Sequence, residues 1–367
     1  MENSTSDCES FMANSSVVGN LSFETSSPEV NIRDNDFPLM MECISYVMIC
    51  VALFGLPGNI LTIIIYVKIG LSESINISTC ALGVSDILAV SFITWNAICF
   101  IPAFLRLDVR FLPSEIVVFT GGATSEMFGA TTAWVTAYIS CERCLCVVFP
   151  LKIRHIITRQ RSVLIIITIF TINIVSSLST YLTVYNFVFT YDVERNKTVL
   201  GLKLTNSSEA DALYNFNFVF SSVFMNLLPL AFILVFSITL VIHMKRNALW
   251  RLQAANETVN PTNINSSDNR AQRKYMADMR VSKTVLTVSV ASCILGFLYA
   301  VRSLMAAVVP GFQPMQTYGA EYKLSSRLLL LVSEINSSMN FAIYYKMGSK
   351  FRGTLRHLLR LKESGNT

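Results

Sequence analysis

Three acidic side chains, Asp86, Glu142 and Glu334, stand inside long apolar stretches of this sequence. A carboxylate buried among apolar groups is costly unless it is paired, hydrated or neutralised. Each is therefore a candidate for ion binding or charge pairing. Glu142 is followed directly by Arg143, and a strongly basic segment begins at Lys152.

Residues typical of catalysis are sparse. The three histidines, His155, His243 and His357, lie at the edges of apolar stretches and away from any pair of acids. The sequence has no phosphate-binding glycine loop, zinc-ligand spacing or nucleophile motif. We therefore predict that the chain is not an enzyme, and we expect no organic cofactor.

The composition is that of a membrane protein. Of 367 residues, 52% are hydrophobic and only 14% are charged, whereas soluble domains carry about 25% charged residues. The charges cluster and leave long apolar gaps. The net charge of +5 comes from basic connecting segments, so we expect contact with anionic lipid and no nucleic-acid partner.

Seven charge-poor stretches are each long enough for a helix to cross a membrane, which takes about 20 residues. Strands would need alternating polarity and a closed barrel, and that alternation is absent. The fold class is thus all-α, a bundle of seven transmembrane helices. The predicted spans are 43–68, 76–103, 115–148, 161–185, 213–246, 280–309 and 325–346.

Basic residues gather in 143–161, 245–283 and the C-terminal end, which fall on one side and are predicted to be cytoplasmic. Residues 1–41 hold seven acids and one base and are predicted to be a disordered extracellular tail. The seven-helix domain spans 42–347, an amphipathic helix on the inner leaflet spans 348–361, and 362–367 form a cytoplasmic tail. The predicted glycosylation sites are Asn3, Asn14, Asn20, Asn196 and Asn206.

Several motifs resemble the rhodopsin-like G-protein-coupled receptors. Glu142-Arg143 with Pro150 seven residues after the arginine is similar to the inner end of that family's third helix. Residues 82–86 are close to its second-helix Leu-x-x-x-Asp, and 340–344 resemble its Asn-Pro-x-x-Tyr, with Phe341 in place of proline. The sixth helix departs most, because only Cys293 remains of Phe-x-x-Cys-Trp-x-Pro.

The resemblance implies a receptor in the plasma membrane with an extracellular N-terminus and a cytoplasmic C-terminus. It would couple an extracellular ligand to a heterotrimeric G protein. The general pattern is similar to invertebrate neuropeptide receptors of the FMRFamide-receptor-like kind and to molluscan chemosensory receptors, so a neuropeptide ligand is expected and a small external molecule is the alternative. A membrane transporter is the alternative from another class, although the internal repeats typical of transporters are absent.

The resemblance also assigns roles to residues. The switch for G-protein coupling is Glu142, Arg143, Pro150, Asn340 and Tyr344, with Glu142 holding Arg143 at rest. A sodium ion is expected at Asp86, with oxygens from Thr132, Asn336, Ser337 and Asn340. The alternatives without a bound ion are a water-filled polar cluster or a packing contact between Asp86 and Asn59.

Helical phase extends this assignment to a ligand pocket. Ser125, Thr132 and Arg143 are spaced by 7 and 11 residues and share one face of the third helix. Glu334 and Arg327 share a stripe of the seventh helix. The ligand residues expected are Ser125, Glu126, Arg302, Arg327 and Glu334, with Glu334 binding a basic group, and Glu126 the weaker candidate turned towards the fourth or fifth helix. A Glu334–Arg302 or Glu334–Arg327 salt bridge is the alternative.

The nine cysteines predict no firm disulfide. The family joins the outer end of its third helix to the second outer loop, but the matching position here is Val118 and residues 186–212 contain no cysteine. A Cys8–Cys43 bridge stays open as an alternative. No cysteine spacing suggests a metal site.

Overall fold

The computed structural model describes residues 36–149, 152–192, 196–204, 219–257, 266–312 and 317–359, together with residues 212 and 216. The chain divides into two units, Met1–Pro38 and Leu39–Thr367. Only the last three residues of the first unit are described. The architecture below is that of the second unit.

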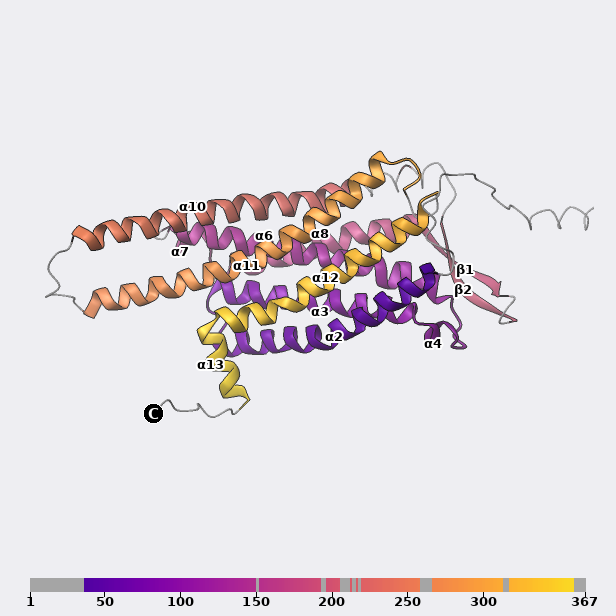
Figure 1. Cartoon of the computed structure of the whole chain (residues 1–367), viewed down its shortest axis with the longest axis horizontal. Helices are drawn as coiled ribbons and strands as arrows, with labels where there is room; N and C mark the ends of the chain where they lie inside the picture. Colours follow the sequence, from indigo (N-terminus) through magenta and orange to yellow (C-terminus); the bar gives the residue numbers. More distant parts are fainter. Residues whose placement is uncertain are drawn as a thin grey trace, which may run out of the picture. The chain divides into compact units, whose positions relative to one another are not determined.

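Long helices lie side by side and form a bundle (Figure 1). The predicted spans correspond to α2 (Asp36–Ile69), α3 (Ser74–Cys99), α6 (Thr124–Val148), α8 (Arg159–Val184), α10 (Leu228–Glu257), α11 (Ser266–Val308) and α12 (Gly319–Met347). The short helices α4 (Pro102–Leu105), α5 (Pro113–Val117) and α7 (Ile153–Ile156) lie in the connections. The seven-helix fold is therefore confirmed.

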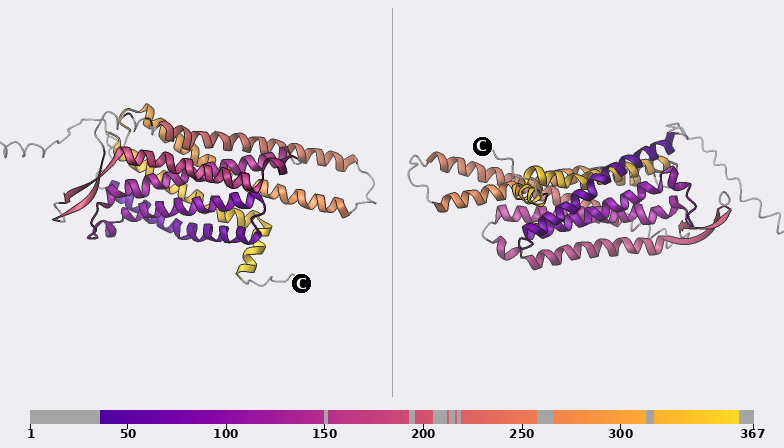
Figure 2. Two further views of the ribbon diagram at one scale, coloured as in Figure 1. Left: turned by 180° about the vertical axis from the view of Figure 1, so that it is seen from behind. Right: turned by 90° about the horizontal axis from the view of Figure 1, so that it is seen from below.

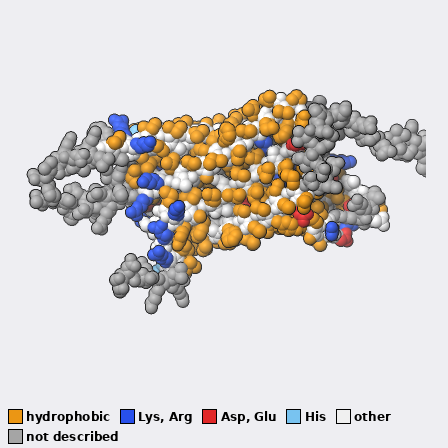
Figure 3. Space-filling view, in the orientation of Figure 1, with side chains coloured by type: hydrophobic (Ala, Val, Ile, Leu, Met, Phe, Trp, Pro, Cys, Tyr) orange, Lys and Arg blue, Asp and Glu red, His pale blue; other side chains and the backbone are white. Residues whose placement is uncertain are grey.

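The bundle exposes apolar side chains over its middle, and Lys and Arg gather at the end that carries α13 (Figure 3). By length and composition alone, five spans suffice to cross a membrane: Phe37–Ile69, Ser74–Cys99, Arg159–Leu178, Ser221–Asn247 and Met279–Val308. The long helices α6 and α12 fall outside this set. Many of the buried side chains of α6 and α12 are polar, and this lowers the hydropathy of these two helices. Polar groups inside the bundle are therefore concentrated on α6 and α12.

One predicted boundary is wrong. Helix α2 begins at Asp36, inside the segment predicted as tail. Pro38 lies in its first turn, where the missing backbone N–H is tolerated. Beyond the predicted spans, α10 continues to Glu257 and α11 begins at Ser266; residues 253–257 include Gln, Ala and Glu, which favour helix. Figure 2 shows α10 and α11 extending beyond the other helices.

Two π-helical segments widen the helices at their outer ends. Segment η1 (Val118–Ala123) joins α5 to α6, and η2 (Ser221–Leu227) precedes α10. Pro229 follows η2 closely. Because proline has no N–H and crowds the preceding turn, the helix accommodates it with altered hydrogen bonding just before that residue. Segment η2 is thus a local loosening of the fifth membrane helix before Pro229.

The inner end is closed by α13 (Ser349–Leu358), which leaves the bundle at a steep angle after α12 (Figure 1). Phe351 is 2% exposed and packs with Ile65 and Tyr344. Full burial of a phenylalanine contributes about 1.5–3 kcal/mol, which ties α13 to α2 and α12. The apolar face predicted for this helix therefore packs on the bundle at Phe351 and Leu355.

Helices α2 and α12 approach closely at Gly58. A β-carbon at this position would lie 3.1 Å from the Cβ of Phe341. This distance is shorter than ordinary van der Waals contact, so a side chain at position 58 would crowd Phe341. The Gly58-Asn59 pair of the sequence is thus explained by packing at its first member.

At the outer end, β1 (Tyr185–Asp192) and β2 (Lys197–Leu204) form an antiparallel hairpin. The hairpin is attached to the segment before α5 by backbone hydrogen bonds: Leu112 N–H donates to Leu200 O and Leu200 N–H to Arg110 O, both at 2.9 Å. The Glu115 carboxylate accepts a bond of 2.8 Å from the N–H of Leu202.

Gly201 makes this attachment possible, because a β-carbon there would lie 2.5 Å from Glu115 Oε2. Lys197 and Asp108 add an ion pair farther along the hairpin. These contacts join the second outer loop to the start of the third membrane helix, the two places that the related family links through cysteine.

Candidate functional site

The inner end of α6 holds a buried acid. Glu142 is 1% exposed, its Oε1 lies 3.5 Å from Arg143 Nη2, and its Oε2 accepts a hydrogen bond of 3.2 Å from Ser78 Oγ on α3. Arg143 is thus linked to α3 through Glu142. The adjacent charge pair expected from the sequence is present, and Ser78 is a partner that the sequence did not single out. Pro150 lies outside the described residues.

One turn deeper in the bundle, α6 and α11 are joined by a hydrogen bond between Ser140 Oγ and Ser289 Oγ, at 2.7 Å. Both residues are buried, at 1% exposure. Ser140 lies three residues before Arg143 and so on the same side of the helix. The contact holds α11 against α6 close to the arginine.

The middle of the bundle holds Asp86, which is 0% exposed. Asn340 Nδ2 donates to its Oδ2 at 2.7 Å, and the Thr132 hydroxyl lies 3.0 Å from its Oδ1 and 2.9 Å from Ser85 Oγ. Ser337 is a further neighbour of this carboxylate. The structure thus brings α3, α6 and α12 together at one acid.

Asn59 does not carry the contact offered as an alternative for Asp86. Its Nδ2 donates to the backbone oxygens of Gly55 at 3.1 Å and Ser337 at 3.2 Å. It therefore joins α2 to the backbone of α12, while Asp86 takes its partners from side chains of α6 and α12. Asn336 Oδ1 is buried and has no hydrogen-bond partner among the described residues.

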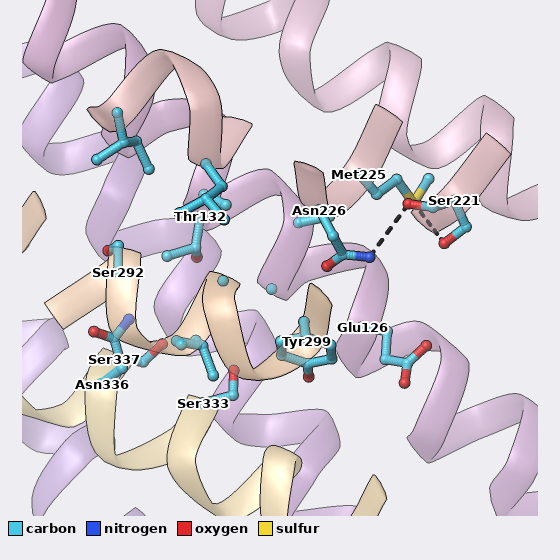
Figure 4. A pocket seen from close by; sticks show the side chains of 17 residues that line it. Glu126, Thr132, Ser221, Met225, Asn226, Ser292, Tyr299, Ser333, Asn336 and Ser337 are labelled. Atoms are coloured by element: carbon cyan, nitrogen blue, oxygen red, sulfur yellow. Dashed lines mark hydrogen bonds between the residues drawn. The ribbon is translucent and has the colours of Figure 1, made fainter. Parts of the chain in front are cut away.

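A pocket opens between α6, η2, α10, α11 and α12 (Figure 4). Figure 4 shows Glu126 and Tyr299 towards one end and Ser292, Asn336 and Ser337 towards the other. Thr132 lines the pocket and also contacts Asp86, so the pocket reaches the buried acid at its inner end.

Of the five ligand residues expected from the sequence, only Glu126 is among those that line this pocket. It faces α11 and not the fourth or fifth helix: Glu126 Oε1 lies 3.6 Å from Arg302 Nη2. Arg302 Nη1 also donates to Ser326 Oγ at 2.8 Å. The expectation of a Glu334–Arg302 salt bridge is therefore wrong, because Arg302 is turned across the pocket towards α6.

Arg302 is also framed by two aromatic rings. Its guanidinium carbon lies 5.5 Å from the centroid of Tyr299 and 5.4 Å from that of Tyr322. Both distances suit a cation–π interaction. The residue thus holds α11 to α12 through Ser326 and Tyr322, and to α6 through Glu126.

Arg327 lies on the opposite side of α12, facing α2 and α3. Its Nη2 donates to Ser45 Oγ at 2.7 Å, its Nη1 lies 3.4 Å from the backbone oxygen of Asn96, and its guanidinium carbon lies 4.2 Å from the centroid of Phe100. The side chain is 3% exposed. It therefore ties three helices together, away from the pocket lining.

Glu334 is 0% exposed, and neither carboxylate oxygen has a hydrogen-bond partner among the described residues. The neighbouring Thr94 hydroxyl has one proton and donates it to Val90 O at 2.7 Å. Arg327 acts on Glu334 electrostatically but makes its hydrogen bonds elsewhere. The helical-phase argument placed Glu334 towards the ligand, whereas its carboxylate lies at the α3–α12 contact. Ser125 is likewise buried and donates to Gly122 O at 2.7 Å.

Two pocket residues carry no prediction from the sequence. Asn226 lies in η2, and its Nδ2 donates to Ser221 O at 3.2 Å; Tyr299 lies on α11 beside Glu126. A lone polar residue three positions before Pro229, inside an apolar run, is a signal that would have singled out Asn226. Tyr299 gives no such signal, because tyrosine is ordinary in membrane helices.

The remaining predicted sites lie at the surface or outside the described residues. Asn196 is exposed at the hairpin turn with φ 50°. Asn3, Asn14, Asn20 and Asn206 lie outside the described part, as does Cys8. The cysteines that the structure describes are free thiols, and Cys43 is exposed while Cys99 is buried.

Comparison with known proteins gives two results. The sequence model of the family described as "7 transmembrane receptor (rhodopsin family)" matches residues 58–344. The crystal structure of squid rhodopsin is similar, with a TM-score of 0.64 and 17% sequence identity over 88% of this chain and 86% of that chain. At this identity the structural similarity shows the fold alone. No curated protein sequence matches the chain.

Proposed function

The chain belongs to the rhodopsin family of seven-transmembrane receptors, and from this premise we propose that it transmits the binding of an extracellular neuropeptide to a heterotrimeric G protein. The family itself consists of receptors that signal across membranes, and the ligand class is the finer part of the proposal. The ligand site is the pocket that contains Glu126, and the coupling site is the inner end of α6 at Arg143.

One observation carries the coupling role. Arg143 is held by Glu142, Glu142 is held by Ser78, and α11 is bonded to α6 one turn away through Ser140 and Ser289. The proposed resting state is thus held here by one ion pair and two hydrogen bonds, which can break without unfolding the bundle. When α11 moves outward, the Ser140–Ser289 bond breaks and Arg143 becomes accessible to a G protein from the cytoplasmic side. Asn340 and Tyr344, both buried on α12, form the rest of the proposed switch.

The decisive experiment needs no identified ligand, because receptors of this kind signal at a basal rate set by the resting equilibrium. Membranes from cells that express the receptor with a panel of G proteins are assayed for nucleotide exchange. Glu142→Gln removes the charge that holds Arg143, so basal exchange rises by about five- to tenfold, the factor for loss of about 1–1.4 kcal/mol of resting-state stabilisation. Arg143→Ala in the same background returns exchange to that of untransfected membranes.

Surface expression, measured by antibody to an N-terminal tag, is the control for folding. Equal exchange for Glu142→Gln and Glu142→Gln/Arg143→Ala at equal surface expression would remove the coupling role from Arg143. A screen of peptide and small-molecule libraries on the Glu142→Gln receptor then decides the ligand class. Responses confined to non-peptide molecules would replace the neuropeptide by a chemosensory ligand.

The proposed orientation has the N-terminus outside and the C-terminus in the cytoplasm of a plasma-membrane receptor. Lys and Arg gather at the end of the bundle that carries α13 (Figure 3), which supports a cytoplasmic location for that end. The hairpin lies at the other end, which would be extracellular, and its exposed Asn196 is a proposed glycosylation site.

A sodium ion at Asp86 is a second proposal for this chain. The donor set suits it, since one carboxylate with neutral oxygens fits a monovalent hard cation. Thr132 and Ser337 would supply hydroxyl oxygens, and the unpartnered Oδ1 of Asn336 lies on the same side of α12. Asn340 donates to Asp86 and so orients the carboxylate. A bound cation would supply positive charge that favours the packed arrangement of α3, α6 and α12.

A further inference from the structure

Glu126 is the one charged side chain among the described residues that line the pocket. The rest of the lining consists of hydroxyl, amide and apolar groups, such as Ser221, Asn226 and Leu295. Figure 4 shows its carboxylate at one end of the pocket, beside Tyr299. A ligand in this pocket therefore meets one negatively charged side chain, Glu126, at one end of the pocket.

The partner of that charge is held loosely. Glu126 and Arg302 are 3.6 Å apart, and their side chains are 43% and 13% exposed. Ion pairs of this exposure contribute little, about 0–1 kcal/mol, because water and ions screen them. A second cation of similar geometry competes with Arg302 on nearly equal terms.

Arg302 does not depend on Glu126 for its place. It keeps its hydrogen bond to Ser326 and its contacts with the rings of Tyr299 and Tyr322 when the carboxylate turns away. The exchange therefore leaves no buried charge without partners. Glu334 offers no such exchange, because it is 0% exposed and is not among the pocket-lining residues.

Resting on the proposed receptor function, we propose that Glu126 is the ligand's charge anchor: it binds a primary amine or guanidinium group of the ligand, which displaces Arg302 and releases the outer end of α11 from α6. The ligand class is thus an organic cation whose remaining parts fill an uncharged pocket. Such a group is present at a peptide N-terminus and in the side chains of Lys and Arg.

This exchange is connected to the coupling site through the contacts between α6 and α11. The two helices are joined at the pocket by the Glu126–Arg302 ion pair and near Arg143 by the Ser140–Ser289 hydrogen bond. Helix α11 runs from Ser266 to Val308 without an internal proline, so one continuous helix carries both Arg302 and Ser289. Loss of the outer contact lowers the free energy needed to break the inner one.

A tethered cation tests the proposal without an identified ligand. Ala130 lines the pocket four residues after Glu126, where β-carbons on one helix are about 5–6 Å apart. Ala130→Cys is labelled with aminoethyl methanethiosulfonate, which adds a primary amine, or with hydroxyethyl methanethiosulfonate, which adds a neutral group of equal length. Labelling of purified receptor is measured by mass spectrometry, and wild-type receptor controls for the native cysteines.

The amine label is expected to raise nucleotide exchange by about two- to fivefold over the unlabelled variant, the factor that corresponds to a partly exposed ion pair. The hydroxyethyl label leaves exchange at the unlabelled value. In Glu126→Gln/Ala130→Cys the amine label has no further effect, whereas Glu334→Gln/Ala130→Cys responds as Ala130→Cys does.

Equal responses to the two labels, a response that persists without Glu126, or no response at complete amine labelling each overturn the proposal. Glu142→Gln in the Ala130→Cys background separates this from failure of the proposed function. If that variant raises exchange and the amine label does not, only the charge anchor is wrong. If neither raises exchange, coupling through Arg143 is wrong.

Discussion

The outer half of the bundle holds two acid–arginine neighbourhoods, one on each side of α12. On the pocket side, Glu126 and Arg302 meet across α6 and α11 with 43% and 13% of their side chains exposed. On the other side, Glu334 and Arg327 lie between α12, α3 and α2 at 0% and 3% exposure. The residue types are the same, but the surroundings differ.

The two neighbourhoods differ in the interaction partners of each arginine. Arg327 is held by a hydroxyl, a backbone oxygen and an aromatic ring, so removing it breaks contacts among three helices. Arg302 pairs with the partly exposed carboxylate of Glu126 and keeps its hydrogen bond to Ser326 when that carboxylate is taken. A buried charge of this kind is structural, and a half-exposed one is exchangeable.

The largest expected effect is on stability. Arg327→Ala removes the hydrogen bonds to Ser45 and Asn96 and the ring contact with Phe100, and it leaves a cavity. We expect a loss of about 2–4 kcal/mol in the free energy of unfolding. Arg302→Ala is the matched control, with a smaller expected loss of about 1–2 kcal/mol, because it removes the hydrogen bond to Ser326, the ring contacts and a partly exposed ion pair. Thermal unfolding of the purified receptors, followed by tryptophan fluorescence, compares the two.

Equal midpoints for Arg327→Ala and Arg302→Ala would erase the distinction between the two neighbourhoods. A larger loss for Arg302→Ala would reverse it and assign the structural role to the pocket side.

A smaller effect, of opposite sign, is expected at Glu334. Its carboxylate is buried with no hydrogen-bond partner among the described residues, so replacing it with an apolar side chain of similar length removes a desolvated group. Glu334→Met should raise stability by about 1–2 kcal/mol in the same assay. Asp86→Leu is the comparison, and it should lower stability because Thr132 and Asn340 lose an acceptor. A lower midpoint for Glu334→Met would mean that Glu334 compensates the charge of Arg327.

The smallest expected effect concerns sodium. Replacing N-methylglucamine by sodium at constant ionic strength should lower basal nucleotide exchange by about two- to fivefold, equivalent to about 0.4–1 kcal/mol. Asp86→Asn should abolish this response, and Glu334→Met should keep it. The same sodium dependence in wild type and Asp86→Asn would exclude an ion at Asp86, and loss of the response in Glu334→Met would move the site outward along α12.

The sequence predicted the inner half of the site better than the outer half. Glu142–Arg143 are neighbours in the chain, so their contact needs no knowledge of helix packing. Asp86, Thr132 and Asn340 were brought together by resemblance to a family, and the structure places them within hydrogen-bond distance.

The outer half has no such motif, and helical phase alone was used there. Phase places Glu334 on a face of its helix, but it does not say whether α3 or α6 lies opposite that face. The π-helical turn η1 precedes Glu126 and the turn η2 contains Asn226; each shifts the register of a helix, and neither is visible in residue spacing. Arg302 could reach either acid, and the packing of α11 decides which.

The way the β1–β2 hairpin is attached affects how the protein responds to reducing agents and how fast the hairpin can move. Hydrogen bonds from Leu112 and Leu200, with the Glu115 carboxylate under Gly201, hold the hairpin to the start of α5. This attachment contains no thiol, so reducing agents leave it intact. It can also open and reclose reversibly on the microsecond-to-millisecond timescale of loop and domain motions. The hairpin is therefore held to the bundle by noncovalent contacts, whereas a disulfide would hold it covalently.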